Sequence, residues 1–234
     1  YVEEQLAKAH GKNGEWVGAA AVILEVETGE VLALASNALF DPNDFVPPVR
    51  REVYQRYQAM ERERPLVSRA FQDHFQPGSV FKVVSAVAGM EQHFIDASTA
   101  IECRGKFREN LSYFKCHLLT GHGTVTLREA MERSCNVFFY TVGHQTGVGG
   151  IAYWAKQFSF GAPTGIDLPG EAGGILPETQ QRELDGVSLA TGQHQLMATP
   201  LQVTQMIAMV ARDGTKVVPH VRRGGALPPV ATPL

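Results

Sequence analysis

The sequence predicts an α+β fold in which short strands come first and several helices follow. Two short apolar runs, residues 20–25 and 31–35, are joined by the turn sequence Glu27-Thr28-Gly29-Glu30. A later segment, residues 80–90, carries apolar residues on every face of a helix, which is the pattern of a helix buried inside a domain. Strands that must pack with helices around one core indicate an α+β or three-layer arrangement.

The composition excludes an intrinsically disordered chain. It also argues against a nucleic-acid partner and against a membrane-spanning helix. The chain has 234 residues, of which 44% are hydrophobic and 19% are charged, enough apolar material for one large domain or two small ones. Lys and Arg number 21 against 24 Asp and Glu, so no strongly basic face is available to bind nucleic acid. The longest apolar run, residues 19–24, is far shorter than the ~20 residues of a membrane helix.

The first elements follow from local sequence. The two N-terminal runs form a hairpin because each is short and apolar, and because Thr28-Gly29 supplies the positive φ of a tight turn. Within the charged stretch 49–64, apolar residues fall at Val53, Tyr57 and Met60. Spacings of four and three residues predict an amphipathic surface helix over this stretch.

Polar residues mark the start of two later helices. Thr126 is followed three residues later by Glu129, the pattern of a capping box, and this helix is expected to end near Ser134. The segment Thr199-Pro200-Leu201-Gln202 has Thr at the N-cap, Pro at the first helical position and Gln at the third. Gly214 fits the C-terminal end of that helix.

Lys82 is the residue of the central helix that needs an explanation, because lysine is rarely buried without a partner. Ser79 lies three residues earlier, on the same helix face, where Cβ atoms are roughly 5–6 Å apart. Burial lowers the pKa of a lysine, which would let a neutral amine take the serine proton. The helix N-terminus would then stabilise a developing oxyanion. In the alternative interpretation, Ser79 only caps the helix and Lys82 extends to solvent.

Two motifs connect this pair to a known family. The segment Gln76-Pro77-Gly78-Ser79-Val80-Phe81-Lys82 resembles the active-site motif of the penicillin-binding protein transpeptidases. Ser134-Cys135-Asn136 resembles the second motif of that family, Ser-x-Asn. Three further stretches also resemble the family, so that the resemblance extends over residues 18–221; they are residues 29–33, 164–171 and 199–202.

The resemblance implies a role for each motif residue. Ser79 would be the nucleophile that attacks the penultimate D-Ala carbonyl of a peptidoglycan stem peptide and releases the terminal D-Ala, with Lys82 as general base. Ser134 would relay a proton toward the leaving amine, and Asn136 would bind the substrate backbone and hold Lys82. An amine of a neighbouring stem peptide would then take the acyl group and form a cross-link. β-Lactams would acylate the same serine, and no metal or organic cofactor is implied.

Within the family, two stretches look most like the elongation-type class B group, penicillin-binding protein 2. They are Gly-His-Gly-Thr-Val at 121–125 and Thr-Gly-Ile-Asp-Leu-Pro-Gly-Glu at 164–171. This similarity implies a location at the periplasmic face of the bacterial inner membrane, through an N-terminal anchor that is not in this sequence. It also implies a membrane glycosyltransferase of the elongation machinery as partner.

The third motif of the family, Lys-Thr-Gly, is not found in the sequence, since Thr191-Gly192 follows Ala190 and Lys216 follows Thr215. Relatives carry that motif well after the helix that begins at 199–202. We therefore expect a truncated transpeptidase domain, inactive by itself, with an incomplete three-layer α/β/α fold of the transpeptidase and β-lactamase type. Its parts would be a lead-in from a pedestal domain (1–17), the transpeptidase core (18–221) and a Pro-rich tail (222–234).

Cys103 and Cys116 lie near His117 and His122 in the sequence, and three interpretations stay open. The two thiols would form a disulfide in an oxidising periplasm, bind zinc together with one of the histidines, or remain unpaired. Zinc sites usually contain close ligand pairs such as Cys-x₂₋₄-Cys, which is not the spacing here. Cys135, inside the Ser-x-Asn motif, is expected to be a small packing residue beside the cleft.

Two other functions fit part of the pattern. A serine β-lactamase or a β-lactam sensor also uses Ser-x-x-Lys. Those relatives lack the stretches at 29–33 and 164–171, and the sequence offers no evident group for deacylation. A degenerate, non-catalytic scaffold of the penicillin-binding type is the second alternative, motivated by the missing third motif.

Overall fold

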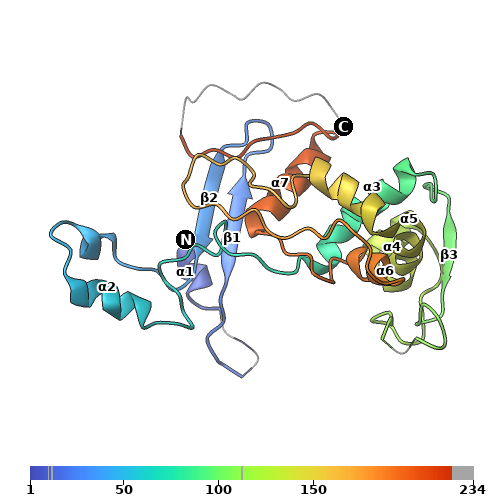
Figure 1. Cartoon of the computed structure of the whole chain (residues 1–234), viewed down its shortest axis with the longest axis horizontal. Coiled ribbons are helices and arrows are strands. Elements are labelled where there is room, and N and C mark those ends of the chain that lie inside the picture. The colour runs from blue at the N-terminus through green and yellow to red at the C-terminus, as the bar shows by residue number, and fades with distance from the viewer. Residues whose placement is uncertain (10, 12, 112, 223–234) are drawn as a thin grey trace. The chain divides into compact units, whose positions relative to one another are not determined.

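The computed structural model describes residues 1–9, 11, 13–111 and 113–222 (Figure 1). The chain divides into two compact units. The first, called here the hairpin unit, comprises Tyr1–His74, Pro163–Gly173 and the segment from Thr199 onward. The second, the helical unit, comprises Phe75–Ala162 and Gly174–Ala198. All of the site residues predicted from the sequence belong to the helical unit.

The hairpin unit is built on two antiparallel strands, β1 (Ala20–Leu24) and β2 (Val31–Ser36). In the turn between them Gly29 has a φ of +82°, and a Cβ atom there would lie 2.5 Å from the backbone oxygen of Val218. A side chain at this position would be both strained and in collision. Helix α7 (Pro200–Ala211) packs on β1, and α1 (Val2–Leu6) contacts β2. The predicted hairpin is therefore confirmed.

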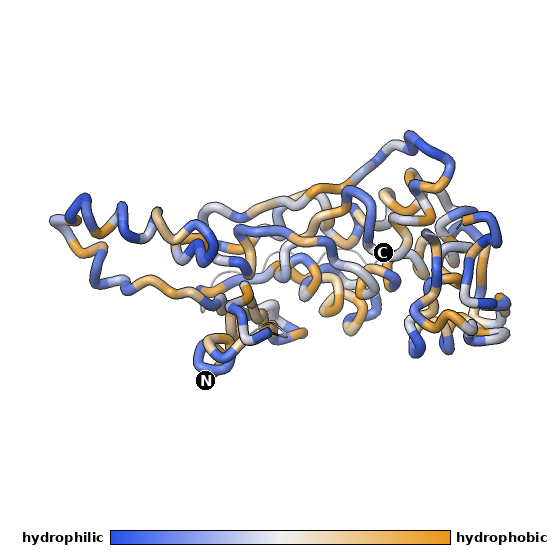
Figure 2. Tube along the Cα trace, turned by 90° about the horizontal axis from the view of Figure 1, so that it is seen from below, coloured by the Kyte–Doolittle hydropathy of each residue, from blue (hydrophilic) through white to orange (hydrophobic). Residues whose placement is uncertain are grey.

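The predicted surface helix is shorter than the sequence indicates. Helix α2 runs from Arg51 to Gln58 after a 3₁₀ turn, η1 (Pro42–Phe45). Val53 and Tyr57 are buried as expected, whereas Met60 lies beyond the helix and is exposed. A proline follows at position 65 and disfavours helical backbone just before it, where φ is +44°. Figure 2 shows hydrophobic and hydrophilic residues alternating along the α2 segment, at the left of the view.

The helical unit consists of four helices and a small two-stranded sheet. Helix α3 packs against α5, and α5 packs against α6; Figure 1 shows α3, α4, α5 and α6 gathered together. The elements, in chain order, are η2 (Gly78–Phe81), α3 (Lys82–Glu91), β3 (Ala100–Cys103), β4 (Gly123–Thr126), α4 (Leu127–Glu132), α5 (Asn136–Gln157) and α6 (Asp185–Leu189). Strands β3 and β4 were not expected from the sequence.

The central helix is buried over most of its surface rather than all of it. Six of the ten residues of α3 are buried, Lys82 among them. Val80 and Met90, which the sequence places on a buried face, are exposed. Val80 precedes α3 in the 3₁₀ turn, and Met90 lies in the last turn of the helix, so both are at the ends, where packing against α5 is incomplete.

Both predicted capping boxes are present. Glu129 accepts a hydrogen bond from the backbone N–H of Thr126 at 2.9 Å, and the side chain of Thr199 accepts from the backbone N–H of Gln202 at 3.0 Å. Helix α4 ends just before Ser134, as predicted.

Helices combined with two small antiparallel sheets confirm the α+β prediction for the described residues. Of the predicted Pro-rich tail, residues 223–234 lie outside the described part of the chain. None of the helices in the described ranges is both long enough and apolar enough to cross a membrane.

Candidate active site

Ser79 lies on a tight turn that exposes its side chain. It is the second residue of η2, immediately after Gly78, whose φ is +60°. The backbone N–H of Gly78 donates to the carbonyl of Gly192 at 3.0 Å. A Cβ atom at Gly192 would lie 2.1 Å from the backbone oxygen of Gly78, so the two chain segments are in direct backbone contact. This contact fixes the turn while leaving Ser79 itself exposed to solvent.

Lys82 is buried, with 1% of its surface exposed, and every proton of its ammonium group has an acceptor. Nζ donates to the backbone oxygen of Ser134 at 2.9 Å, to Ser134 Oγ at 3.0 Å and to Asn136 Oδ1 at 2.7 Å. Neither η2 nor α3 has a side-chain cap hydrogen bond. The alternative in which Ser79 caps the helix and Lys82 extends to solvent is therefore wrong.

Burial makes Lys82 easier to deprotonate than an exposed lysine. Burial lowers the pKa of the amine from 10.5 to about 8, and the thiols of Cys116 and Cys135 oppose this shift in part. A lysine with such a pKa is partly deprotonated near neutral pH. The amine is therefore suited to accept a proton.

One expected contact is missing. Among the described residues, no hydrogen bond joins Ser79 Oγ to Lys82 Nζ, although the sequence spacing predicts that the two groups meet. The three donors of the ammonium are directed to Ser134 and Asn136 instead. Ser79 lies in a 3₁₀ turn just before α3, and the contacts of Nζ with Ser134 and Asn136 direct the amine to the second motif rather than to the Ser79 hydroxyl.

The turn between α4 and α5 brings the second motif to Lys82. Ser134 has a φ of +51°, a left-handed conformation that reverses the chain between the two helices. Asn136 is the first residue of α5, and its Nδ2 donates to the backbone oxygen of Lys115 at 3.2 Å. Asn136 thus links Lys82 to the segment that precedes the motif by about twenty residues.

A cavity of about 270 Å³ contains Ser79 and Asn136 in its lining. Three aromatic residues contribute to its wall: Tyr113, Phe114 and Tyr140. The remaining lining residues are polar: Ser188, Thr191 and Gln193. Sequence reasoning did not assign these six residues to the site; Tyr140, which follows the Ser-x-Asn motif by four residues, lies near enough in the sequence to have suggested part of it.

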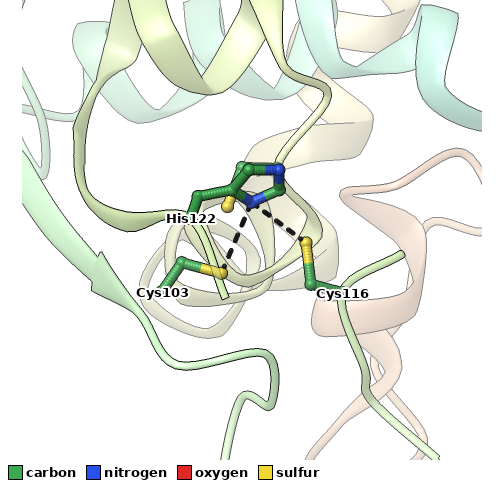
Figure 3. A group of neighbouring side chains, drawn as sticks. Cys103, Cys116 and His122 are labelled. Atoms are coloured by element: carbon green, nitrogen blue, oxygen red, sulfur yellow. Dashed lines mark hydrogen bonds between the residues drawn. The ribbon is translucent and has the colours of Figure 1, made fainter. Parts of the chain in front are cut away.

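The predicted disulfide is not formed. Cys103, Cys116 and Cys135 are all free thiols and are all buried. Together with His122 they form a group, called here the Cys/His group, in which one ligand atom from each residue lies within 4.8 Å of the others. Figure 3 shows the sulfur atoms of Cys103 and Cys116 directed at the ring of His122, with Sγ–Nδ1 distances of 3.6 and 3.4 Å.

Cys135 is buried, as expected of a small packing residue, and it also belongs to the Cys/His group, which sequence reasoning did not find. The reason is long-range: the β3–β4 strand pair brings Cys103 close to residues 116–123, and the start of α5 adds Cys135. Spacings of 13, 6 and 13 residues along the chain do not reveal such a group.

The pKa shifts in the Cys/His group do not all point the same way: burial raises the pKa of the Cys135 thiol to about 12, whereas the shifts of the two other groups favour metal binding. Burial raises the pKa of Cys116, but the backbone N–H groups of Asn136, Leu118 and Val137 outweigh it, so that the pKa of this thiol lies below its usual value. Burial also lowers the pKa of His122, which keeps its ring neutral. Around a zinc ion, tetrahedral sulfur and nitrogen donors lie roughly 3.5–3.8 Å apart, close to the observed Sγ–Nδ1 distances. Four such donors fit zinc.

Comparison with known proteins identifies the family. The family model described as the penicillin-binding protein transpeptidase domain matches residues 19–224. The chain thus belongs to the penicillin-binding protein transpeptidase family.

Particular relatives agree with this assignment. The peptidoglycan D,D-transpeptidase MrdA of Acinetobacter baumannii is 35% identical over 222 residues, which are 89% of this chain and 33% of that protein. Penicillin-binding protein 2 of Helicobacter pylori, in its complex with MreC, has a TM-score of 0.84 and 29% identity over 92% of this chain and 41% of that one. The predicted similarity to penicillin-binding protein 2 is confirmed.

A more distant structure contains a covalent complex. Penicillin-binding protein A of Mycobacterium tuberculosis, as a ceftriaxone acyl-enzyme, has a TM-score of 0.79 and 25% identity over 93% of this chain and 49% of that one. The chain spans about a third of the length of the MrdA relative.

The backbone contact at Gly192 generates a prediction. Gly192→Ala should displace the Ser79 turn, because the new Cβ would meet the backbone oxygen of Gly78 and because φ at Gly192 is +70°. We expect a loss of roughly 2 kcal/mol or more in the free energy of unfolding, measured by urea denaturation. The control is Gly149→Ala in α5, where a Cβ would meet no atom within 4 Å. Equal stability of the two variants would show that the contact does not constrain the turn.

Proposed function

We propose that the chain carries the serine acylation site of a peptidoglycan D,D-transpeptidase that acts on D-Ala-D-Ala stem peptides. The observation that carries the proposal is the buried Lys82, which binds Ser134 and Asn136, while Asn136 lines the same cavity as the exposed Ser79. An exposed hydroxyl three residues from a desolvated amine of lowered pKa suits an activated serine nucleophile. Membership of the transpeptidase family and the activity named for the MrdA relative support it.

The geometry suggests how acylation proceeds. Neutral Lys82 takes the proton of Ser79 Oγ as that oxygen forms a bond to the carbonyl carbon of the penultimate D-Ala. The tetrahedral intermediate then collapses, the C–N bond breaks, and a proton passes through Ser134 Oγ, which is 3.0 Å from Nζ, to the leaving amine of the terminal D-Ala. An ester on Ser79 remains. A second stem peptide contributes an amine that breaks the ester, forms the cross-linking amide and returns the proton to Ser79 Oγ.

Location and partners follow from the same proposal. We infer a place at the periplasmic face of the inner membrane, where peptidoglycan is cross-linked, and a membrane glycosyltransferase of the elongation machinery as partner. The related penicillin-binding protein 2 of H. pylori forms a complex with MreC, which supports an elongation-type assembly. A β-lactam sensor, a serine β-lactamase and a non-catalytic scaffold remain the alternatives that the experiments below separate.

Replacement of the nucleophile is the direct test. In the complete gene product that contains this chain, Ser79→Ala should abolish the covalent adduct with benzylpenicillin, detected as a mass increase by intact-protein mass spectrometry. Ser98→Ala, which removes an exposed hydroxyl outside this cavity, should still form the adduct. A Ser79→Ala protein that is labelled would overturn the assignment. An adduct lost within seconds would instead indicate a β-lactamase, and no adduct on the parent protein would indicate a scaffold.

The lowered pKa of Lys82 predicts a pH dependence. The amine must be neutral to accept the serine proton, so the acylation rate constant should rise about tenfold per pH unit below pH 8 and level off above the pKa of about 8. Stopped-flow acylation by a chromogenic cephalosporin between pH 6 and 9.5 measures it. Lys115→Met, a change at an exposed lysine, should leave the midpoint in place. A flat profile would exclude Lys82 as the general base.

We also propose that the Cys/His group binds one zinc ion with a structural role. Three buried thiols and a neutral imidazole are a frequent ligand set of structural zinc. Through Cys135 the ion would fix the Ser134-Cys135-Asn136 turn against the segments that carry Cys103 and Cys116. The acylation chemistry described above needs no metal.

Metal analysis of the purified complete gene product should find about one zinc per chain. Cys116→Ser should lose the metal and lower the melting temperature, because structural zinc contributes directly to folding free energy. His117→Ala is the matched control, since this adjacent histidine is outside the Cys/His group and its loss should leave the zinc bound. A metal-free protein whose mass is lower by two hydrogens under non-reducing conditions would support the disulfide instead.

A further inference from the structure

The described residues between Cys103 and Cys116 form an irregular hairpin, called here the cleft hairpin (residues 104–111 and 113–115). The backbone N–H of Phe107 donates to the oxygen of Phe114 at 3.0 Å, and the N–H of Cys116 donates to the oxygen of Gly105 at 2.9 Å. The hairpin brings two consecutive aromatic residues, Tyr113 and Phe114, to the cavity that contains Ser79.

The two aromatic residues differ in their surroundings. Phe114 is buried, whereas Tyr113 is 84% exposed, although both line the cavity. The ring of Tyr113 meets the ring of Phe114 edge to face, at 5.4 Å between centroids, and Phe114 meets Tyr140 in the same way at 5.3 Å. Tyr113 is thus the exposed end of a row of packed rings, with apolar surface left free for a ligand.

The cleft hairpin is held in place by polar contacts as well as by its rings. Arg108 Nη1 pairs with Glu183 Oε1 at 3.1 Å, and Nη2 donates to His144 Nε2 at 2.9 Å. The ring of Phe107 packs against that of Tyr140 at 6.0 Å. Contacts with α5 and with the segment before α6 therefore support the hairpin, so the ring of Tyr113 lies on a supported loop.

The other lining residues of the cavity are polar, opposite in character to the aromatic ones. Asn136, Ser188, Thr191 and Gln193 offer amide and hydroxyl groups that suit the backbone of an acyl donor. An extended peptide bound by these groups, with its carbonyl at Ser79, would place its neighbouring side chain in the same 270 Å³ space as the Tyr113 ring.

We propose that Tyr113 is a specificity-determining residue whose ring packs against the apolar part of the acyl donor on the N-terminal side of its penultimate D-Ala. The proposal rests on the proposed function, because it needs an acyl donor in this cavity. The ligands that it favours are stem peptides with aliphatic surface before the penultimate D-Ala and β-lactams with an aryl or alkyl acyl group. It predicts discrimination between donors, without a change in the reactivity of Ser79.

Two penicillins that differ only in the acyl group provide the test. Benzylpenicillin carries a phenylacetyl group, and 6-aminopenicillanic acid has the same ring system without it. In the complete gene product, Tyr113→Ala should lower the acylation rate constant for benzylpenicillin about 3–10-fold, the factor expected for loss of one aromatic contact. The constant for 6-aminopenicillanic acid should not change, and Tyr113→Phe should retain the parental ratio of the two constants.

Tyr153→Ala is the matched control, since Tyr153 is an exposed tyrosine of α5 that does not line the cavity. In this variant the ratio of the acylation rate constants for benzylpenicillin and 6-aminopenicillanic acid should equal that of the parent protein. An unchanged ratio in Tyr113→Ala would overturn the proposal, as would an equal fall for both penicillins, which would show a structural effect on the Ser79 turn. If the parent protein is acylated by neither penicillin, the proposed function itself fails, and this inference fails with it.

Discussion

The hydrogen bonds of one buried ammonium group constrain most of the helical unit. Lys82 is almost completely removed from water, and a buried charged donor left without an acceptor costs well over the ~1–3 kcal/mol of a neutral one. Its acceptors are Ser134 and Asn136, more than fifty residues further along the chain. The first turn of α3, the turn after α4 and the start of α5 must therefore keep their mutual positions. The packing of α3 on α5 supports the same arrangement.

Three consecutive residues connect two networks in this unit. Ser134 and Asn136 bind Lys82, while Cys135, between them, belongs to the Cys/His group. Asn136 adds a second link, because its Nδ2 donates to the Lys115 carbonyl and its backbone N–H lowers the pKa of Cys116. A change in either network is thus transmitted to the same short turn, and the left-handed φ of Ser134 leaves that turn few other conformations.

The parts of the structure that were predictable from sequence depend on local spacing. The hairpin turn at Gly29, the capping boxes at Thr126 and Thr199, and the burial of Lys82 each follow from residues a few positions apart. The family motifs extended this to Ser134 and Asn136. The Cys/His group and the aromatic wall at Tyr113 could not be derived, because they assemble from segments whose contact depends on the β3–β4 pairing and on the start of α5. For the same reason the sequence left three interpretations of Cys103 and Cys116 open: two cysteines thirteen residues apart do not show which third and fourth side chains complete their surroundings.

The proposed function places two opposite requirements on this site. A nucleophile must be exposed to meet its substrate, whereas an amine must be desolvated for its pKa to fall. Residues three positions apart lie toward one face of a helical turn, yet their exposure can differ. Here the Gly78–Gly192 contact holds a turn in which Ser79 is exposed, and the first turn of α3 buries Lys82. Among the described residues the Nζ donors are directed to Ser134 and Asn136, and no direct Ser79–Lys82 hydrogen bond is present. In the proposed mechanism Ser134 Oγ, already bonded to Nζ, then becomes the group best placed to carry a proton between the buried amine and the open cavity.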